Sequence, residues 1–395
     1  MKLARPINLA FILAEIAVSC IRTPFFKKEK PRGERILIFG YFGLGDAIMF
    51  LPALRALKQQ FPQSEITVVA SRKSTAWEAL EMSGCVSETL FFEFKEASAT
   101  ERYEFNKELI KRNFDTAICI HVTPLQYFLP VLLKIPARIG HVVPWHTWWQ
   151  PRPNWILNFP AHLKGFDKTH EIDRYRSLLK AADIDRNNFN NDISLPVAEN
   201  SMIEAREMLL KIGVNDADFV VGIHASVGYV QSWKSWGREK FIELAKLLQK
   251  QHSAKILILG AENEAQFLKE LASDIGENAF AVIPPSGKSR WTLDPTLGVL
   301  KRCNIVIGND SGVGHIAISI GVPTVRIFGM TDFWGYKALK APHLDIWKNL
   351  PCSPCVSIGM INPNYNLHTC GHRNCINTIT VEEVFVSVEQ MNITP

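Results

Sequence analysis

The chain has 395 residues and a formal net charge of +5; 47% of its residues are hydrophobic and 21% are charged. This composition excludes a disordered chain, and the length lets two domains each bury a core. The mildly basic charge suits anionic partners such as nucleotide phosphates or a membrane surface. Nucleic acid is disfavoured as a partner, because the sequence carries no zinc-finger or RNA-binding signature.

The first 34 residues form a separate N-terminal segment. Residues 3–21 predict an amphipathic helix with a polar stripe that includes Arg5, Glu15 and Arg22, and a basic linker follows it. The helix has three interpretations: an interfacial membrane anchor, a helix packed on the protein's own core, or a signal peptide ending at Cys20. Glu15 argues against the signal peptide, and no stretch is long and apolar enough to predict a membrane span.

Residues 35–185 predict a first α/β domain. An apolar strand at 35–39 leads through a glycine-rich turn into a helix at 47–60, and further strands follow at 65–70 and 116–121. A strand, a helix and a strand in succession form the βαβ unit of a parallel sheet. The polar, asparagine-rich stretch at 185–192 then predicts an inter-domain linker.

Residues 195–345 predict a second α/β domain of the same kind, and residues 346–395 follow as a cysteine-containing tail with a C-terminal helix. The expected strands lie at 219–224, 255–260, 305–308 and 323–329. The fold class is therefore α/β, with two Rossmann-like domains. Ligands of such domains bind in a cleft at the carboxyl ends of the strands.

The glycine-rich turn after the first strand contains Gly40, Gly43, Gly45 and Asp46. Its spacing does not fit a dinucleotide fingerprint, and Asp46 would repel a pyrophosphate. An aspartate at this place suits a general base or an acceptor for a sugar hydroxyl. The alternative is that Asp46 caps the helix, since aspartate is a favoured N-cap residue.

A second polar turn, at residues 309–315, follows a strand and opens a helix. Asp310, Ser311 and Gly312 would present backbone N–H groups and a hydroxyl to a phosphate. His315 in the first helical turn could donate a hydrogen bond into the same pocket. The alternative for His315 is a core histidine with satisfied hydrogen bonds.

Two further segments carry candidate ligand-binding residues. Lys234 lies between two tryptophans and Ser226 precedes it in the same connection, so both could bind a phosphate. Glu262 and Glu264 follow the next strand and could accept hydrogen bonds from a ribose. The alternatives are an exposed lysine beside a half-buried tryptophan pair, and two acids that favour the helix dipole.

The order and content of these segments resemble glycosyltransferase family 9, the ADP-heptose:lipopolysaccharide heptosyltransferases. The resemblance spans roughly residues 35–390. Its matching pieces are Gly45-Asp46 with Pro52, Lys234-x-Trp236, the run 260–264, Asn309-Asp310-Ser311-Gly312-x-x-His315, Gly321-x-Pro323, and Phe328 to Asp332. The sequence departs from the family at Ser311, where threonine is more usual, and at Gly314, where a bulkier residue is common.

The resemblance implies a GT-B fold and an inverting transfer that requires no cofactor for catalysis. The acceptor would lie in the first domain beside Gly45, with Asp46 as the base that removes the acceptor hydroxyl proton. The implied donor-binding residues, all in the second domain, are Ser226 and Lys234 for the diphosphate, Glu264 for the ribose, Asp310 for the sugar, and Ser311, Gly312 and His315 for the diphosphate end.

Two regions are not settled by the resemblance. Cys352, Cys355, Cys370 and Cys375 could hold a structural zinc ion, form disulfides or remain unligated. The aromatic, proline-rich stretch at 144–155 could touch a glycolipid or the membrane interface, or form a buried cluster. Around this stretch, three residues could bind acidic groups of the acceptor: Arg138, His141 and Arg152.

The sequence therefore predicts a glycosyltransferase that moves a heptose from ADP-heptose onto a lipopolysaccharide core or a related surface glycan. We expect it in the cytoplasm, with peripheral contact to the inner face of the plasma membrane. The alternatives are another donor such as a UDP-sugar, a nucleotide-sugar epimerase, a Rossmann oxidoreductase, or a non-catalytic carbohydrate-binding relative. The missing dinucleotide fingerprint argues against the oxidoreductase.

Overall fold

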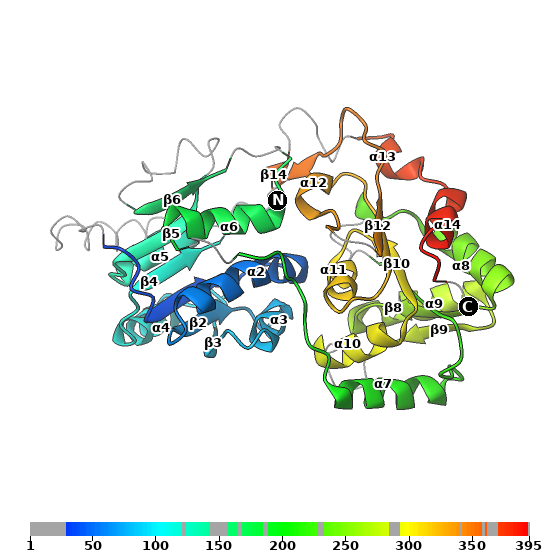
Figure 1. Ribbon diagram of the computed structural model, residues 1–395, viewed down its shortest axis with the longest axis horizontal. Helices are drawn as coiled ribbons and strands as arrows, with labels where there is room; N and C mark the ends of the chain where they lie inside the picture. Colours follow the sequence, from blue (N-terminus) through cyan, green and yellow to red (C-terminus); the bar gives the residue numbers. More distant parts are fainter. Residues whose placement is uncertain are drawn as a thin grey trace. The chain divides into compact units, whose positions relative to one another are not determined.

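The computed structural model describes residues 29–120, 124–142, 156–163, 168–184, 189–226, 233–283, 293–339, 342–357, 360–361 and 370–393. The chain divides into two compact units (Figure 1). The first comprises Met1–Lys164 and Ile172–Asp192, and the second comprises Gly165–Glu171 and Ile193–Pro395. The chain therefore enters the second unit briefly, returns to the first, and crosses again after Asp192. The predicted N-terminal helix lies outside the described residues.

The first unit is built on a six-stranded parallel sheet in the order β3-β2-β1-β4-β5-β6. Its strands are β1 (Arg35–Phe39), β2 (Glu65–Ala70), β3 (Glu88–Phe91), β4 (Thr116–Cys119), β5 (Ala137–Val142) and β6 (Phe159–His162). Its helices are α2 (Leu44–Gln60), α3 (Ala76–Met82), α4 (Ala99–Lys111), α5 (Pro124–Leu132) and α6 (Glu171–Ala181). Four of the five residues of β1 are buried, as expected for a parallel strand covered on both faces.

The second unit repeats this topology, with the sheet order β12-β11-β10-β7-β8-β9, all parallel. Its strands are β7 (Val220–His224), β8 (Lys255–Leu259), β9 (Ala279–Val282), β10 (Ile305–Asn309), β11 (Thr324–Ile327) and β12 (His343–Ile346). Its longer helices are α7 (Glu199–Lys211), α8 (Arg238–His252), α9 (Ala265–Ile275), α10 (Leu293–Arg302), α11 (Gly312–Ser319) and α14 (Val381–Glu389). Shorter pieces are η3 (Glu262–Glu264), α12 (Phe333–Tyr336), β13 (Val356–Ser357), β14 (Met360–Ile361) and α13 (Asn374–Asn377).

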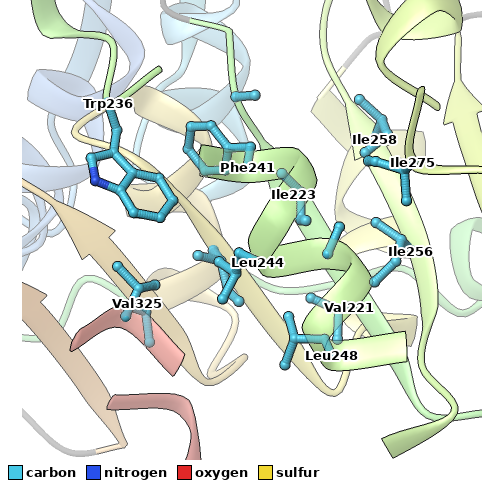
Figure 2. Close-up of a cluster of buried hydrophobic side chains, with 14 of the residues drawn as sticks. Val221, Ile223, Trp236, Phe241, Leu244, Leu248, Ile256, Ile258, Ile275 and Val325 are labelled. Atoms are coloured by element: carbon cyan, nitrogen blue, oxygen red, sulfur yellow. The ribbon is translucent and has the colours of Figure 1, made fainter. Parts of the chain in front are cut away.

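The core of the second unit lies between its sheet and helix α8. Figure 2 shows Phe241, Leu244 and Leu248 of α8 beside Val221 and Ile223 of β7. The residues at 346–395, which we treated as a tail, belong to this unit. Helix α14 adds to the same core three valines on one helical face, Val381, Val384 and Val388.

Both sheets have the doubly wound order, in which the chain starts at the centre and proceeds first to one edge and then to the other. The direction reverses between β1 and β4 in the first unit and between β7 and β10 in the second. Ligands of this fold bind at such a switch point, outside the carboxyl ends of the strands. The residues that follow β1, β7 and β10 are therefore the ones placed to form sites. No helix in the described part of the chain could span a membrane.

Candidate active site

At the switch point of the second unit, Asn309 ties together the loops that follow two strands. It is the last residue of β10 and is buried. Its side-chain amide donates to the Ala225 carbonyl at 2.8 Å, and its amide oxygen accepts from the Trp236 backbone N–H at 2.8 Å. The sequence analysis quoted Asn309 as part of a motif but did not assign it this role. It fixes the connection that carries Ser226 and Lys234 against the end of β10.

Asp310 lies directly after β10 and is the centre of a charged cluster. Its carboxylate lies 3.6 Å from Lys234 Nζ and 3.9 Å from His315 Nε2. Burial raises the pKa of Asp310, but the positive charges of Lys234 and Arg326 outweigh burial, so the net shift is downward. The structure thus brings together three of the predicted donor-site residues, with a carboxylate held ionised beside an ammonium group.

His315 is buried and contacts Arg326, a residue that the sequence analysis missed. Nη1 of Arg326 lies 3.2 Å from His315 Nδ1, and the Tyr336 ring meets the imidazole edge-on at 5.8 Å. Burial and, after it, the charge of Arg326 lower the pKa of His315 to about 3 against the opposing effect of Asp310. The histidine is therefore neutral at physiological pH, and its unprotonated ring nitrogen can accept a hydrogen bond from the guanidinium.

Arg326 in β11 is itself held by a buried ion pair with Asp345 in β12. Both guanidinium–carboxylate distances are 2.8 Å, and Nη2 also donates to the Tyr336 carbonyl at 2.8 Å. The two residues are partners in the parallel register of β11 and β12. Gly314 leaves room for the arginine, because a Cβ atom there would meet Arg326 Cδ at 2.7 Å. A bulkier residue common in the family at this place would not fit beside this arginine.

His224, at the end of β7, is a second histidine that the sequence analysis did not single out as a site residue. Its Nδ1 lies 3.1 Å from the Ser311 hydroxyl oxygen. Burial lowers the pKa of His224 to about 4, although Glu264 has the opposite effect. The neutral imidazole holds the hydroxyl of Ser311, which is the N-cap residue of α11 and makes no side-chain capping bond to that helix. The first backbone N–H groups of α11 are therefore not capped by Ser311, and an anion is favoured there.

Glu264 and Ser226 form a pair within the second unit. The Ser226 hydroxyl donates to one carboxylate oxygen of Glu264, and the Ala261 backbone N–H donates to the other at 3.0 Å. Glu264 thereby closes the short helix η3 at the carboxyl end of β8. The site thus holds an acceptor of hydrogen bonds where a ribose was expected, with its orientation fixed by a serine and a backbone amide.

In the first unit, Asp46 lies in the first turn of α2, which follows β1 at the other switch point. The helix begins at Leu44, three residues earlier than expected, and its N-cap residue is Gly43. Asp46 is thus the third helical residue, and the alternative that it is the N-cap is wrong. It is half-buried, and favourably placed for a negative charge near a helix N-terminus. Gly45 precedes it on the same turn.

Two of the three residues expected to bind acidic acceptor groups are buried. Arg138 in β5 is 1% exposed and donates to the carbonyls of Ile156 at 2.6 Å and Ile135 at 2.7 Å. His141 is also buried, and its ring nitrogens lie 3.1 Å and 2.9 Å from the carbonyl oxygens of Ile120 and Arg174. The contacts that the structure gives these two side chains are with backbone carbonyls, and contact with an acceptor stays a prediction.

The third of these residues, Arg152, lies outside the described residues, as does most of the aromatic stretch at 144–155. Its predicted role therefore stays a prediction.

The four C-terminal cysteines carry free thiols that influence one another. Cys355 and Cys375 are buried and pack with Met330. Burial first, and then the neighbouring Cys352 and Cys370, raise the pKa of both thiols to about 11. Among the described residues, which include all four, no group of three or more cysteine, histidine or acidic side chains is arranged to hold a metal ion. As placed, the cysteines do not form a metal site.

Two doubly wound α/β units of this kind make up the GT-B fold of glycosyltransferases. The family model described as Glycosyltransferase family 9 (heptosyltransferase) matches residues 102–366. The chain belongs to glycosyltransferase family 9.

Individual relatives agree with this assignment. The chain is 26% identical over 302 residues to Lipopolysaccharide heptosyltransferase 3 of Escherichia coli strain K12, covering 73% of this chain and 81% of the relative. Its fold is similar to a glycosyl transferase family 9 structure from Veillonella parvula, with a TM-score of 0.73, 20% identity, and coverage of 92% and 99% of the two chains. The structure of E. coli ADP-heptose lps heptosyltransferase II gives a TM-score of 0.67 at 18% identity, with coverage of 91% and 98%.

Proposed function

We propose that this glycosyltransferase moves a heptose from ADP-heptose onto a lipopolysaccharide core acceptor, with inversion at the anomeric carbon. The observation that carries the proposal is the cluster of Lys234, Asp310 and His315 beside the N-terminus of α11. The names of the relatives, a lipopolysaccharide heptosyltransferase and an ADP-heptose heptosyltransferase, support the donor and the acceptor class.

In the proposed reaction, an acceptor hydroxyl oxygen forms a bond to the anomeric carbon while the bond from that carbon to the phosphate oxygen breaks. ADP leaves with the electron pair of that bond, and the hydroxyl proton passes to Asp46. The negative charge on the departing diphosphate is stabilised by the Lys234 ammonium and the α11 N-terminus. Because protein groups supply this positive charge, we expect turnover without a divalent cation.

In the proposal, the donor is bound by side chains of the second unit that have hydrogen-bond or ion-pair partners of their own. Glu264, held by Ser226 and the Ala261 amide, would accept hydrogen bonds from the ribose. Asp310 would bind hydroxyls of the transferred sugar, since its carboxylate stays ionised. Ser311 and Gly312 would contact the diphosphate end.

Activity measurements on Asp46→Asn and Lys234→Ala test the roles of the two units. Loss of a general base is expected to lower kcat by ~10²–10⁴-fold, and loss of the ammonium by ~10²–10³-fold. Asp173→Asn on α6 and Lys250→Gln on α8 are matched controls, because both side chains are exposed. NMR of the product gives its anomeric configuration, and a retained configuration would overturn the inverting mechanism. Full activity in excess EDTA would support metal independence, and its loss would contradict it.

A thermal-shift comparison of ADP, UDP, GDP and NAD separates this donor from the alternatives. Stabilisation by ADP, lost in Lys234→Ala, is the expected result, and saturation at 100 times Kd adds ~2.7 kcal/mol to the free energy of unfolding. A response to UDP or GDP would keep a transferase with another donor. A response to NAD alone would contradict the proposal and favour an oxidoreductase.

We also propose that the four C-terminal cysteines bind a structural zinc ion. Supporting this are the Cys352-x-x-Cys355 spacing and the mutual effect of the thiols on their pKa values. One zinc ion per chain by elemental mass spectrometry, absent in Cys355→Ser, is the expected result. A metal-free protein after purification without chelators would contradict it.

A cytoplasmic location with peripheral membrane contact through residues 1–34 is likewise proposed, on the amphipathic pattern of that segment. Release of the full chain from membranes by carbonate would support it. Recovery wholly in the soluble fraction before any extraction would contradict the membrane contact.

A further inference from the structure

Two lysine ammonium groups converge on one tryptophan ring in the second unit. Nζ of Lys168 lies 4.8 Å and Nζ of Lys337 lies 4.9 Å from the ring centroid of Trp334. Trp334 and Lys337 are half-buried, whereas Lys168 is exposed. We name these three side chains the cationic platform. Neither the transfer chemistry nor the family motifs quoted above make use of it.

The Trp334 side chain is held in place by contacts with its neighbours. Phe333, next to the tryptophan on α12, stacks on Trp347 with ring centroids 4.4 Å apart and an interplanar angle of 11°. Trp334 meets the same Trp347 edge-on at 5.9 Å. The Asp332 side chain caps α12 by accepting from the Gly335 backbone N–H at 3.1 Å. Because its neighbours already restrict this ring, a ligand that binds beside it causes little further loss of side-chain entropy.

Lys168 reaches the platform from the short segment Gly165–Glu171, which the chain inserts into the second unit. A ring nitrogen of His170, two residues later, lies 3.0 Å from the Lys337 carbonyl oxygen. This contact fixes the segment against the residue after α12. The segment that carries Lys168 is therefore held next to Lys337 by a hydrogen bond to the backbone, without an ion pair.

Within the described part of the chain, no carboxylate lies at ion-pair distance from the two lysines of the platform. The acids on either side of Lys337 in the sequence have other partners: Asp332 caps α12, and Asp345 holds Arg326. Two like charges beside one ring repel each other, and an anion bound between them would relieve this repulsion.

The platform adjoins the site that contains Asp310. Tyr336, two residues after Trp334, meets His315 with ring centroids 5.8 Å apart. The charge of His170 contributes to the lowered pKa of His315. A molecule whose reacting hydroxyl is close to the donor sugar could therefore extend over α12 within the same unit.

We propose that the cationic platform is a subsite for a negatively charged sugar of the acceptor, one that carries a carboxylate or a phosphate. The two ammonium groups, held over the indole ring, would bind its anionic substituent. The inference rests on the proposed transferase function, because it supplies the acceptor with a second point of attachment away from its reacting hydroxyl.

Kinetics with a core oligosaccharide acceptor tests the role of the platform in catalysis. Lys168→Gln and Lys337→Gln are each expected to raise the acceptor KM ~10-fold, with kcat and the donor KM nearly unchanged. Lys250→Gln, an exposed lysine on α8, is the matched control. Acceptor preparations treated with phosphatase, or with their sugar carboxylates reduced, tell which anion is bound. The bound anion is the one whose removal raises the acceptor KM of the wild type to that of the lysine variants.

Direct binding keeps the inference separable from the transferase function. In protein labelled with 5-fluorotryptophan, the Trp334 signal, assigned with Trp334→Phe, is expected to shift with glucuronate or glucose 6-phosphate but not with glucose. Shifts that persist in the double lysine variant, or are equal for all three sugars, would overturn the subsite. If no transfer activity is found but the shift occurs, the proposed function fails and the subsite stands.

Discussion

Mild acid is expected to destabilise the second unit, because two of its buried histidines are held neutral. Burial lowers the pKa of His224 to about 4 and that of His315 to about 3. In the unfolded chain both would titrate near ~6.5. Below that pH the unfolded state binds protons that the folded state does not, so the free energy of unfolding falls as the pH decreases toward the folded pKa values.

The size of the effect follows from these pKa values. For one histidine with a pKa of ~6.5 when unfolded and a much lower one when folded, lowering the pH from 7 to 5 costs ~1.9 kcal/mol. The two histidines together therefore remove ~4 kcal/mol. This is a large fraction of the ~5–15 kcal/mol by which domains are usually stable.

Urea denaturation at pH 7, 6 and 5 measures this loss directly. His224→Asn and His315→Asn are each expected to reduce the loss between pH 7 and 5 by ~2 kcal/mol relative to the wild type, because each removes one titrating ring. His162→Asn, at an exposed position in β6, is the matched control. Variants that keep the full wild-type pH dependence would refute the reasoning, since the two histidines would then titrate normally in the folded protein.

Three further predictions concern the buried contacts around the site. Gly314→Ala places a Cβ atom 2.7 Å from Arg326 Cδ and is expected to cost ~1–3 kcal/mol by thermal denaturation, whereas Gly371→Ala, with open space around it, should be neutral. Asp345→Asn leaves the buried Arg326 charge without its partner and is expected to cost ~3–5 kcal/mol, most of it recovered in Arg326→Met combined with Asp345→Leu; an equal loss in the double variant would contradict this. Trp236→Phe removes the indole hydrogen bond to the Ile379 carbonyl, but Lys240 still donates to that carbonyl. The free energy of unfolding in urea should therefore fall by only ~0.5–1.5 kcal/mol. A larger loss would show that packing of the indole ring dominates.

The sequence was informative wherever a local pattern determines a local structure. The apolar runs before Gly40 and Asp310 predicted strands, and the polar turns after them predicted ligand-binding ends of a parallel sheet. Those turns do follow β1 and β10, which are strands at the points where the strand order of each sheet reverses. The second domain was recognisable for the same reason, because its strands and helices alternate with the spacing of βαβ units.

Pairings between distant strands could not be predicted in this way. Arg326 and Asp345 form an ion pair because β11 and β12 are adjacent and in register. Neither segment on its own predicts that pairing. Arg138 and His141 illustrate the same point, since both were predicted to bind a ligand from their side-chain chemistry alone. Their buried partners are backbone carbonyls of neighbouring segments, and these are visible only once the sheet is assembled.

The excursion of Gly165–Glu171 into the second unit bears on how family members can be recombined. A chimera joined at the Asp192–Ile193 boundary would take the second unit of one parent but inherit this excursion, with Lys168 and His170, from the other. The contacts of those residues with Trp334 and the Lys337 carbonyl would then be made between unrelated sequences. The two units are therefore interleaved along the sequence. A chimera that keeps these contacts has to take residues 165–171 and residues 193–395 from the same parent.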